Sequence, residues 1–145
     1  MSDPLKPGDG QDLLARYKRA QEKRDPDRMM ELYADDAKYR HDPFEAELAG
    51  SNDVRGHWNE LAAARAQVDF DAERTWVSGR IVLSSWHGAY TRRTTGERFR
   101  VRGFSTMELD ASGLITRQRD WPSTRSIGVD SRHLPEPESG GAVDG

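Results

Sequence analysis

The chain has 145 residues, of which 34% are hydrophobic and 32% charged, and its formal net charge is -3. This length suits a single domain with one core. Acidic and basic residues are interspersed and the apolar runs are short, so no nucleic-acid partner and no membrane association are expected. Because the sequence contains no cysteine, disulfides, thiolate nucleophiles and cysteine-ligated metal sites are excluded.

The two ends of the chain differ in composition from the middle. Residues 1–10 and 122–145 are rich in Pro, Gly, Ser and charged residues, which is typical of flexible termini. The predicted domain therefore covers residues 11–121. The first residues lack the charged segment and apolar stretch of a signal peptide, and we expect a cytoplasmic protein.

Two helices are predicted at the start of the domain. Asp9 or Asp12 can cap the first helix, whose apolar stripe has helical spacing and consists of Leu13, Leu14, Tyr17 and Ala20. Asp25-Pro26 supplies an N-cap followed by proline at the first helical position of the second helix. This helix is expected to end at residues 34–36, after the apolar residues Met29, Met30, Leu32 and Tyr33.

A short strand and a third helix follow. The strand is predicted over residues 37–41, ends at Asp42-Pro43, and leads into a loop over residues 45–50. Ser51 or Asn52 can cap the third helix, which is expected to run to about Ala66. Its inner side is predicted to carry Val54, Trp58, Leu61 and Ala62.

The remainder of the domain is predicted to form long strands. They cover residues 68–77, 80–92, 98–109 and 114–121, with turns at 94–97 and 110–113. The strand over 98–109 alternates most cleanly, and one of its faces carries Phe99, Val101, Gly103, Ser105, Met107 and Leu109. Three helices followed by antiparallel strands indicate an α+β fold with the helices on one face of a curved sheet. Such a sheet leaves a cavity at its open end, the usual site for a small ligand.

Several local motifs carry a family resemblance. The segments 14–17 (LARY), 32–37 (LYADDA), 42–44 (DPF), 49–50 (AG) and 114–121 (LITRQRDW) occur in the order and near the spacing found in ketosteroid isomerases and SnoaL-type polyketide cyclases. Over about Gln11 to Trp121, the sequence resembles the nuclear transport factor 2-like superfamily. The resemblance implies a cone-shaped sheet wrapped around three N-terminal helices. It implies no single reaction, because members of this superfamily perform many.

The isomerase resemblance assigns three positions. Tyr17 matches the tyrosine that donates a hydrogen bond to the substrate oxyanion, and Asp42 matches the aspartate that moves the proton. Ser105 stands where the isomerase has a protonated aspartate, a stronger donor to a developing enolate. Steroid isomerisation is therefore not expected. A one-residue difference in spacing before Asp42 leaves open whether His41 or Asp42 faces the pocket.

The cyclase resemblance points to the last strand. Asp120 matches the general acid/base aspartate of SnoaL-type cyclases, and by strand alternation it shares a face with Gln118. Opposite lies a predicted apolar wall of Val101, Gly103 and Met107. If two carboxylates share one apolar cone, their repulsion makes their pKa values differ, so that one can act as a base and the other as an acid.

Each candidate also has a structural explanation. Asp42 can simply form the Asp-Pro turn, Asp120 can pair with an arginine such as Arg119, and the Tyr17 ring can pack in the core. His41 beside a turn can be solvent-exposed. The aromatic residues predicted to line the pocket are equally suited to a core: Trp58, Trp86 and Tyr90.

Metal and cofactor sites are not predicted. His57 and His87 have no metal-ligand spacing, and the sequence lacks a G-x-S-x-G elbow, a Gly-rich phosphate loop and an H-E-x-x-H motif. The outward strand face carrying Arg98, Arg100 and Arg102 is expected to form a homodimer contact, as the convex face commonly does in this superfamily.

Two functional hypotheses follow. The first is a cofactor-independent acid/base enzyme of the isomerase, cyclase or hydrolase type that acts on a hydrophobic carbonyl-bearing or cyclic molecule. Asp120 and Asp42 would transfer protons, and Tyr17, Ser105 and His41 would orient the substrate. The second is a ligand-binding or dimerisation module without chemistry. An enzyme should have both carboxylates in a cavity and a raised pKa, whereas a module should have them exposed or paired with arginines.

Overall fold

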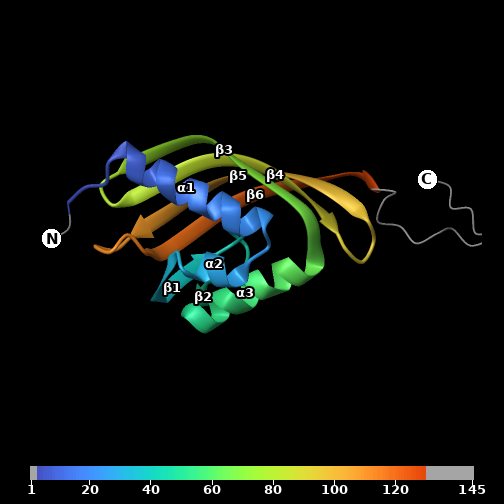
Figure 1. Cartoon of the computed structure of the whole chain (residues 1–145), viewed down its shortest axis with the longest axis horizontal. Helices are drawn as coiled ribbons and strands as arrows, with labels where there is room; N and C mark the ends of the chain where they lie inside the picture. The colour runs from blue at the N-terminus through green and yellow to red at the C-terminus, as the bar shows by residue number, and fades with distance from the viewer. Residues whose placement is uncertain (1–2, 130–145) are drawn as a thin grey trace, which may run out of the picture.

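The computed structural model describes residues 3–129, which form three helices and six strands (Figure 1). The helices are α1 (Pro7–Glu22), α2 (Pro26–Met30) and α3 (Ser51–Ala64). The strands are β1 (Tyr33–Arg40), β2 (Leu48–Ala49), β3 (Arg65–Ser78), β4 (Ile81–Arg92), β5 (Glu97–Leu109) and β6 (Ile115–Val129). No helix in this part of the chain has both the length and the apolar character needed to cross a membrane.

One sheet contains all six strands, in the order β2-β1-β6-β5-β4-β3. The pairs β1–β2, β3–β4, β4–β5 and β5–β6 are antiparallel, whereas β1 runs parallel to β6. The sheet is therefore mixed and not purely antiparallel as expected. The parallel pair arises because α3 and three long strands separate β1 from β6, a connection long enough to bring β6 back in the same direction.

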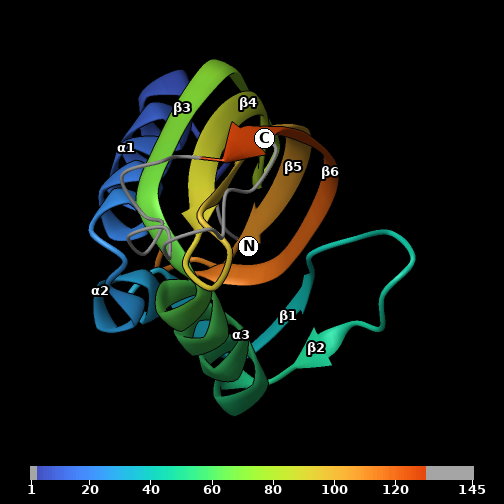
Figure 2. The same ribbon diagram turned by 90° about the vertical axis from the view of Figure 1, so that its right-hand side faces the viewer.

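The α+β class and the cone-shaped sheet with helices on one side are confirmed. Figure 2 shows β3 to β6 as a strongly curved surface, with α1 along one side and α2 and α3 below. The alternation of β5 is as predicted, since Phe99 and Met107 are buried while Arg100 and Arg102 are exposed. The core between helices and sheet contains Leu13, Leu14, Tyr17, Met29, Tyr33, Tyr39, Val54, Trp58, Phe70, Val82, Met107 and Ile115.

The boundaries of the first two helices differ from the prediction. Helix α1 begins at Pro7, within the segment expected to be flexible, because the Asp9 carboxylate accepts a hydrogen bond from the Lys6 backbone N–H at 2.8 Å. Asp25 caps α2 as predicted, through the Arg28 backbone N–H at 3.1 Å. The helix ends early because Tyr33 starts β1, where sheet pairing replaces helical hydrogen bonds.

The third helix begins as expected but with a different cap. Gly50 takes the N-cap position with a φ of +91°, a conformation that favours glycine, so neither Ser51 nor Asn52 provides the cap. Residues 48 and 49, expected in a loop, form the short edge strand β2 beside β1.

The last strand is longer than predicted. It continues to Val129, although residues 122–145 were expected to be a flexible tail, because β5 offers partners along its whole length. Pro122 lies opposite Gly103 and Val129 lies opposite Glu97. The prediction for the rest of the tail, residues 130–145, lies outside the described residues.

Candidate functional site

The hollow of the cone contains a cavity of about 230 Å³. Its lining comes from α1, α3 and five strands or their flanking loops, so it depends on the whole fold. The inner lining includes Tyr17, Tyr39, Trp58, Phe70, Trp86 and Asp120. Exposed residues such as Glu45, Asp69 and Thr124 complete the lining, which shows that the cavity opens to solvent. A concave pocket in which aromatic walls meet converging polar side chains is typical of small-molecule sites.

Asp120 is the buried carboxylate of this cavity, with 6% of the residue exposed. The Tyr39 hydroxyl donates to its Oδ2 atom. The Oδ1 atom accepts from the Ser105 hydroxyl at 2.6 Å and from the Gln118 side-chain amide at 3.0 Å. Burial raises the pKa of Asp120, while these three hydrogen bonds oppose that rise by stabilising the anion. No ion pair to Asp120 is found within residues 3–129, so the alternative of an Arg119 salt bridge is wrong there.

The hydrogen bonds leave room for one more donor. A carboxylate offers about four lone-pair positions. Two on Oδ1 are taken by Ser105 and Gln118, and one on Oδ2 is taken by Tyr39. The remaining position on Oδ2 can accept a proton or a hydrogen bond from a bound molecule. Asp120 is thus held in place by neutral donors and is still able to react.

A second layer of contacts fixes these donors. The Trp86 indole N–H donates to the Ser105 hydroxyl at 2.8 Å, which directs the Ser105 proton to Asp120. The Trp86 ring lies over Gly103, where a Cβ atom would come within 2.7 Å of the ring. The carbonyl oxygen of the Gln118 amide accepts from the Tyr33 hydroxyl, so the amide N–H₂ faces Asp120. Each donor therefore has a fixed orientation.

Tyr17 lies beside this network. It is buried, and its phenol oxygen accepts a hydrogen bond from the Gln118 amide at 3.2 Å. Burial and the nearby charge of Asp120 raise the pKa of Tyr17, so the phenol stays protonated at neutral pH. Its ring also packs edge-on against Trp58 and Phe70, so both the packing interpretation and the placement at the pocket agree with the structure.

His41 and Asp42 lie at the edge of the cavity, and both contribute to its lining. The Asp42 Oδ1 atom accepts from the Phe44 backbone N–H at 2.9 Å, which is the turn-forming role considered for this residue. The His41 ring stacks on His57 with centroids 4.4 Å apart and an interplanar angle of 15°. Neither residue forms a hydrogen bond with Asp120 among residues 3–129.

The predicted binding residues fall into two groups. Trp58, Trp86, Tyr90 and Val101 line the cavity as expected. The others do not line the cavity: Trp86 covers Gly103, and three buried residues lie behind the lining, namely Ser105, Met107 and Gln118. The structure therefore gives these residues a supporting position and not a place at the cavity surface.

The sequence analysis missed three polar residues of the site. Tyr39 and Tyr33 come from β1 and reach β6 because the two strands are parallel neighbours, with Tyr39 opposite Gln118. Strand alternation could have identified Tyr39, because it lies two residues before His41 and therefore shares a strand face with it. Arg65, at the junction of α3 and β3, also lines the cavity and carried no motif.

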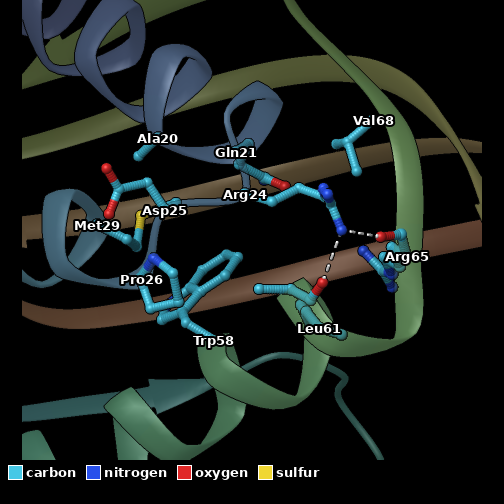
Figure 3. A pocket seen from close by; sticks show the side chains of 11 residues that line it. Ala20, Gln21, Arg24, Asp25, Pro26, Met29, Trp58, Leu61, Arg65 and Val68 are labelled. Atoms are coloured by element: carbon cyan, nitrogen blue, oxygen red, sulfur yellow. Dashed lines mark hydrogen bonds between the residues drawn. The ribbon is translucent and has the colours of Figure 1, made fainter.

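A second, much smaller pocket of about 20 Å³ lies between α1, α2 and α3 (Figure 3). In Figure 3 the Arg24 guanidinium reaches across to the end of α3, where it donates to the carbonyls of Ala62 at 3.0 Å and Arg65 at 2.8 Å. This volume is on the scale of a single water. The pocket therefore serves packing, and Arg24 ties the end of α1 to the start of β3.

No cluster of three or more His, Asp or Glu residues suited to a metal ion occurs within residues 3–129. The polar side chains that line the cavity include four carboxylates, three phenols, two imidazoles, one amide, one hydroxyl and one guanidinium.

The fold and cavity define a small-molecule-binding protein of the nuclear transport factor 2-like superfamily. The sequence pattern of the SnoaL-like domain matches residues 14–118, most of the described chain. The chain therefore belongs to the SnoaL-like domain family. Asp120 lies two residues beyond the matched segment.

Solved structures agree with this assignment at the level of the fold. The chain is similar to SalBIII, an epoxide hydrolase/cyclase-like enzyme with a role in pyran ring formation in the polyether salinomycin, with a TM-score of 0.73, 17% identity, and coverage of 84% of this chain and 96% of that one. It is similar to an LEH-like epoxide hydrolase of Mycobacterium tuberculosis (TM-score 0.68, 17% identity, coverage 80% and 84%). It is also similar to a putative SnoaL-like polyketide cyclase from Shewanella denitrificans (TM-score 0.66, 17% identity, coverage 79% and 90%). No curated protein matches the sequence.

Proposed function

We propose that this protein is a cofactor-independent acid/base enzyme of the cyclase, hydrolase or isomerase type, acting on a hydrophobic carbonyl-bearing or cyclic substrate. The observation that supports this best is the buried carboxylate of Asp120, which contacts three neutral donors and keeps one lone-pair position free. A carboxylate that only stabilised the fold would be expected to pair with a cation or to face solvent.

In this proposal Asp120 transfers the proton. Its burial raises its pKa towards working pH, which makes it a stronger base when ionised and a usable acid when protonated. Tyr17 would donate a hydrogen bond to the oxygen on which negative charge develops, since its phenol stays protonated and borders the same cavity. Tyr39 would keep its own proton and orient Asp120, since its hydroxyl donates to Oδ2 and burial raises the pKa of the phenol.

The similar structures favour cyclic substrates within this class. The names of two of them concern epoxide hydrolysis and pyran ring formation, which are reactions at an oxygen-containing ring. Opening or closing such a ring requires a base for the attacking hydroxyl or water and a donor for the ring oxygen. Asp120 and Tyr17 supply this pair of groups. Ser105 at the position of the isomerase's second acidic donor makes steroid isomerisation the least suitable reaction.

The test is turnover of a panel of hydrophobic epoxides, lactones and ketones, the last followed by exchange of α-protons in D₂O. For any substrate found, Asp120→Asn should lower kcat/KM by at least about 10²-fold and leave the dissociation constant within a few-fold. Asp36→Asn, at an exposed position of β1, is the matched control and should leave kcat/KM unchanged. Full turnover by Asp120→Asn would refute the assignment.

The role of Asp42 is tested in the same assay. Asp42→Asn would lower kcat/KM by a similar factor if Asp42 is the second proton-transfer residue expected from the sequence. Its hydrogen bond to Phe44 predicts a smaller loss, caused by a change in the loop at the cavity edge. A change in KM with kcat retained would mark the second case.

We also propose that the protein is a cytoplasmic homodimer joined through the convex face of the sheet. A row of aromatic residues crosses this face, with Phe104 6.4 Å from both Trp76 and Trp121 between ring centroids. Trp76 and Trp121 are each more than 40% exposed. Acidic and basic residues surround the row, as in the Arg102–Glu73 ion pair, so two copies can face each other in a self-complementary way. Sedimentation of Trp121→Glu should give monomers where the native chain gives dimers, and a monomeric native chain would contradict the proposal.

A further inference from the structure

Arg65 is a charged residue of the cavity with no role in the network around Asp120. It lies at the start of β3, is half-buried, and lines both the large cavity and the small pocket beside it. Within residues 3–129, no carboxylate oxygen lies within 4.0 Å of its guanidinium, whereas arginines such as Arg98 and Arg102 are paired. A half-buried cation without a counter-ion is costly to keep.

None of the other described carboxylates at the cavity edge forms an ion pair with Arg65. Asp69 pairs with Arg98 at 2.9 Å, and Asp42 accepts the hydrogen bond of its own turn. Glu45 is exposed at the edge of the cavity and forms no ion pair in the described chain. Burial lowers the pKa of Arg65, but a guanidinium remains charged at neutral pH. Arg65 thus keeps a permanent positive charge at the cavity, with no direct ion-pair partner among residues 3–129.

The guanidinium is held in a fixed orientation. Its Cζ atom lies 3.9 Å from the centroid of the Tyr90 ring. The Tyr90 ring stacks on Phe99 at 5.2 Å and 22°, and Arg92 in turn lies 4.5 Å from the Phe99 centroid. A guanidinium stacked on a ring keeps the N–H groups of its edge available, and these can hold a carboxylate through two parallel hydrogen bonds.

Arg65 and Asp120 lie at different levels of the sheet. Asp120 is opposite Ser105 on β5, whereas the ring under Arg65 belongs to Tyr90, which is opposite Phe99. An anionic group next to Asp120 would be repelled by that carboxylate, while at Arg65 it would be attracted. The two charges therefore favour one orientation of a bound molecule, with its anionic end at Arg65 and its reacting end at Asp120.

We propose that Arg65, stacked on Tyr90, is a specificity-determining residue that binds a carboxylate of the ligand, and that the substrate is a hydrophobic carboxylic acid. The reaction part of this statement rests on the proposed function, but the binding part does not. The two parts are separated by measuring affinity instead of turnover.

The experiment compares three probes of nearly the same shape by isothermal titration calorimetry at pH 7.5: 2-naphthoate, 2-naphthamide and (2-naphthyl)methylammonium. The native protein should bind 2-naphthoate about 10- to 100-fold more tightly than 2-naphthamide, the usual range for a hydrogen bond to a charged group. Arg65→Gln should remove this preference and leave the affinity for 2-naphthamide within about twofold. Arg65→Lys, which keeps the charge but not the planar fork, should retain part of it.

Two controls separate the possible causes. Arg93→Gln makes the same change in net charge at an exposed position next to the β3–β4 end and should keep the full preference for 2-naphthoate. Asp120→Asn removes a charge that repels the anionic probe, so it should keep or strengthen the preference whether or not the catalytic proposal holds. Equal affinity of the native protein for 2-naphthoate and 2-naphthamide would overturn the proposal. The proposal would also be overturned if the native protein bound the ammonium probe more tightly than 2-naphthoate. An equal loss of affinity for all three probes in a folded Arg65→Gln variant would overturn it as well.

Discussion

The hydrogen bond from Tyr39 to Asp120 predicts a pH-dependent loss of stability when its hydroxyl is removed. Tyr39 is 2% exposed, and its ring stacks on Trp58 with an interplanar angle of 10°, so Tyr39→Phe keeps the packing and deletes only the donor. A hydrogen bond to an ionised group contributes about 1.5–3 kcal/mol, and one between neutral groups contributes about 0.5–1.5 kcal/mol. The deletion should therefore cost more when Asp120 is ionised.

The sign follows from proton linkage. Burial raises the pKa of Asp120 in the folded state, so between the unfolded and the folded pKa the native protein binds more protons than the unfolded chain. Stability consequently falls as pH rises through that window. Loss of the Tyr39 donor further disfavours the anion, which raises the pKa of Asp120 and extends the window to higher pH. The variant should lose about 1.5–3 kcal/mol at pH 7.5 and about 0.5–1.5 kcal/mol at pH 4.

Urea unfolding followed by circular dichroism at the two pH values measures both losses. Tyr33→Phe is the matched control, because Tyr33 is 4% exposed and donates its hydroxyl to the neutral amide of Gln118. That variant should lose about 0.5–1.5 kcal/mol at both pH values. If the two variants lose the same free energy at pH 7.5 and at pH 4, the coupling between Tyr39 and the charge of Asp120 does not exist.

Two further changes test the surroundings of the site. Gly103→Ala should destabilise the fold by about 1–3 kcal/mol and displace the Trp86 ring, because the added Cβ would lie within 2.7 and 2.8 Å of ring atoms. Urea unfolding measures the loss of stability, and a shift in tryptophan fluorescence reports the movement of the ring. An unchanged fluorescence spectrum would contradict the prediction. His57→Gln should flatten the acid side of the stability profile. Burial lowers the pKa of His57 to about 3, so the native state stays neutral while the unfolded chain gains a proton, and stability falls as pH drops from about 6.5 towards 3, by at most about 1.4 kcal/mol per unit. Thermal melting across this range measures the slope, with His87→Gln on the outer face as the control; equal slopes for the two variants would contradict the assignment.

Strand alternation and turn chemistry were sufficient to predict most of the sheet from the sequence. The period-two pattern of β5 is confirmed at most positions: Phe99, Ser105, Met107 and Leu109 are buried, while Arg100 and Arg102 are exposed. The boundary between α2 and β1 was wrong because Leu32 and Tyr33 fit either a helical stripe or a strand. Only the pairing of β1 with β6, through the Ile115 N–H and the Leu32 carbonyl at 2.8 Å, decides between them.

The site was predictable where a motif marked it and not where tertiary contact alone created it. Asp120 and Tyr17 were identified from the resemblance, and both border the cavity. Tyr39 reaches Asp120 across 81 residues of sequence, through a parallel strand pair that no local pattern specifies. Arg65 lies where α3 passes directly into β3, and its position in the cavity depends on how that junction is oriented against α1. Contacts between residues this far apart in the sequence are set by the topology of the fold, and the local sequence pattern does not reveal them.

The central place of β6 in the sheet has a consequence for biosynthesis. This strand leaves the ribosome last of the six, yet it joins β1 and β2 on one side to β5, β4 and β3 on the other. Until β6 is released, β2 and β1 are not hydrogen-bonded to β5, β4 and β3, and Asp120 is not yet in place. Premature termination before this strand would therefore leave a product with no binding chamber, so that the cell obtains either the complete site or none.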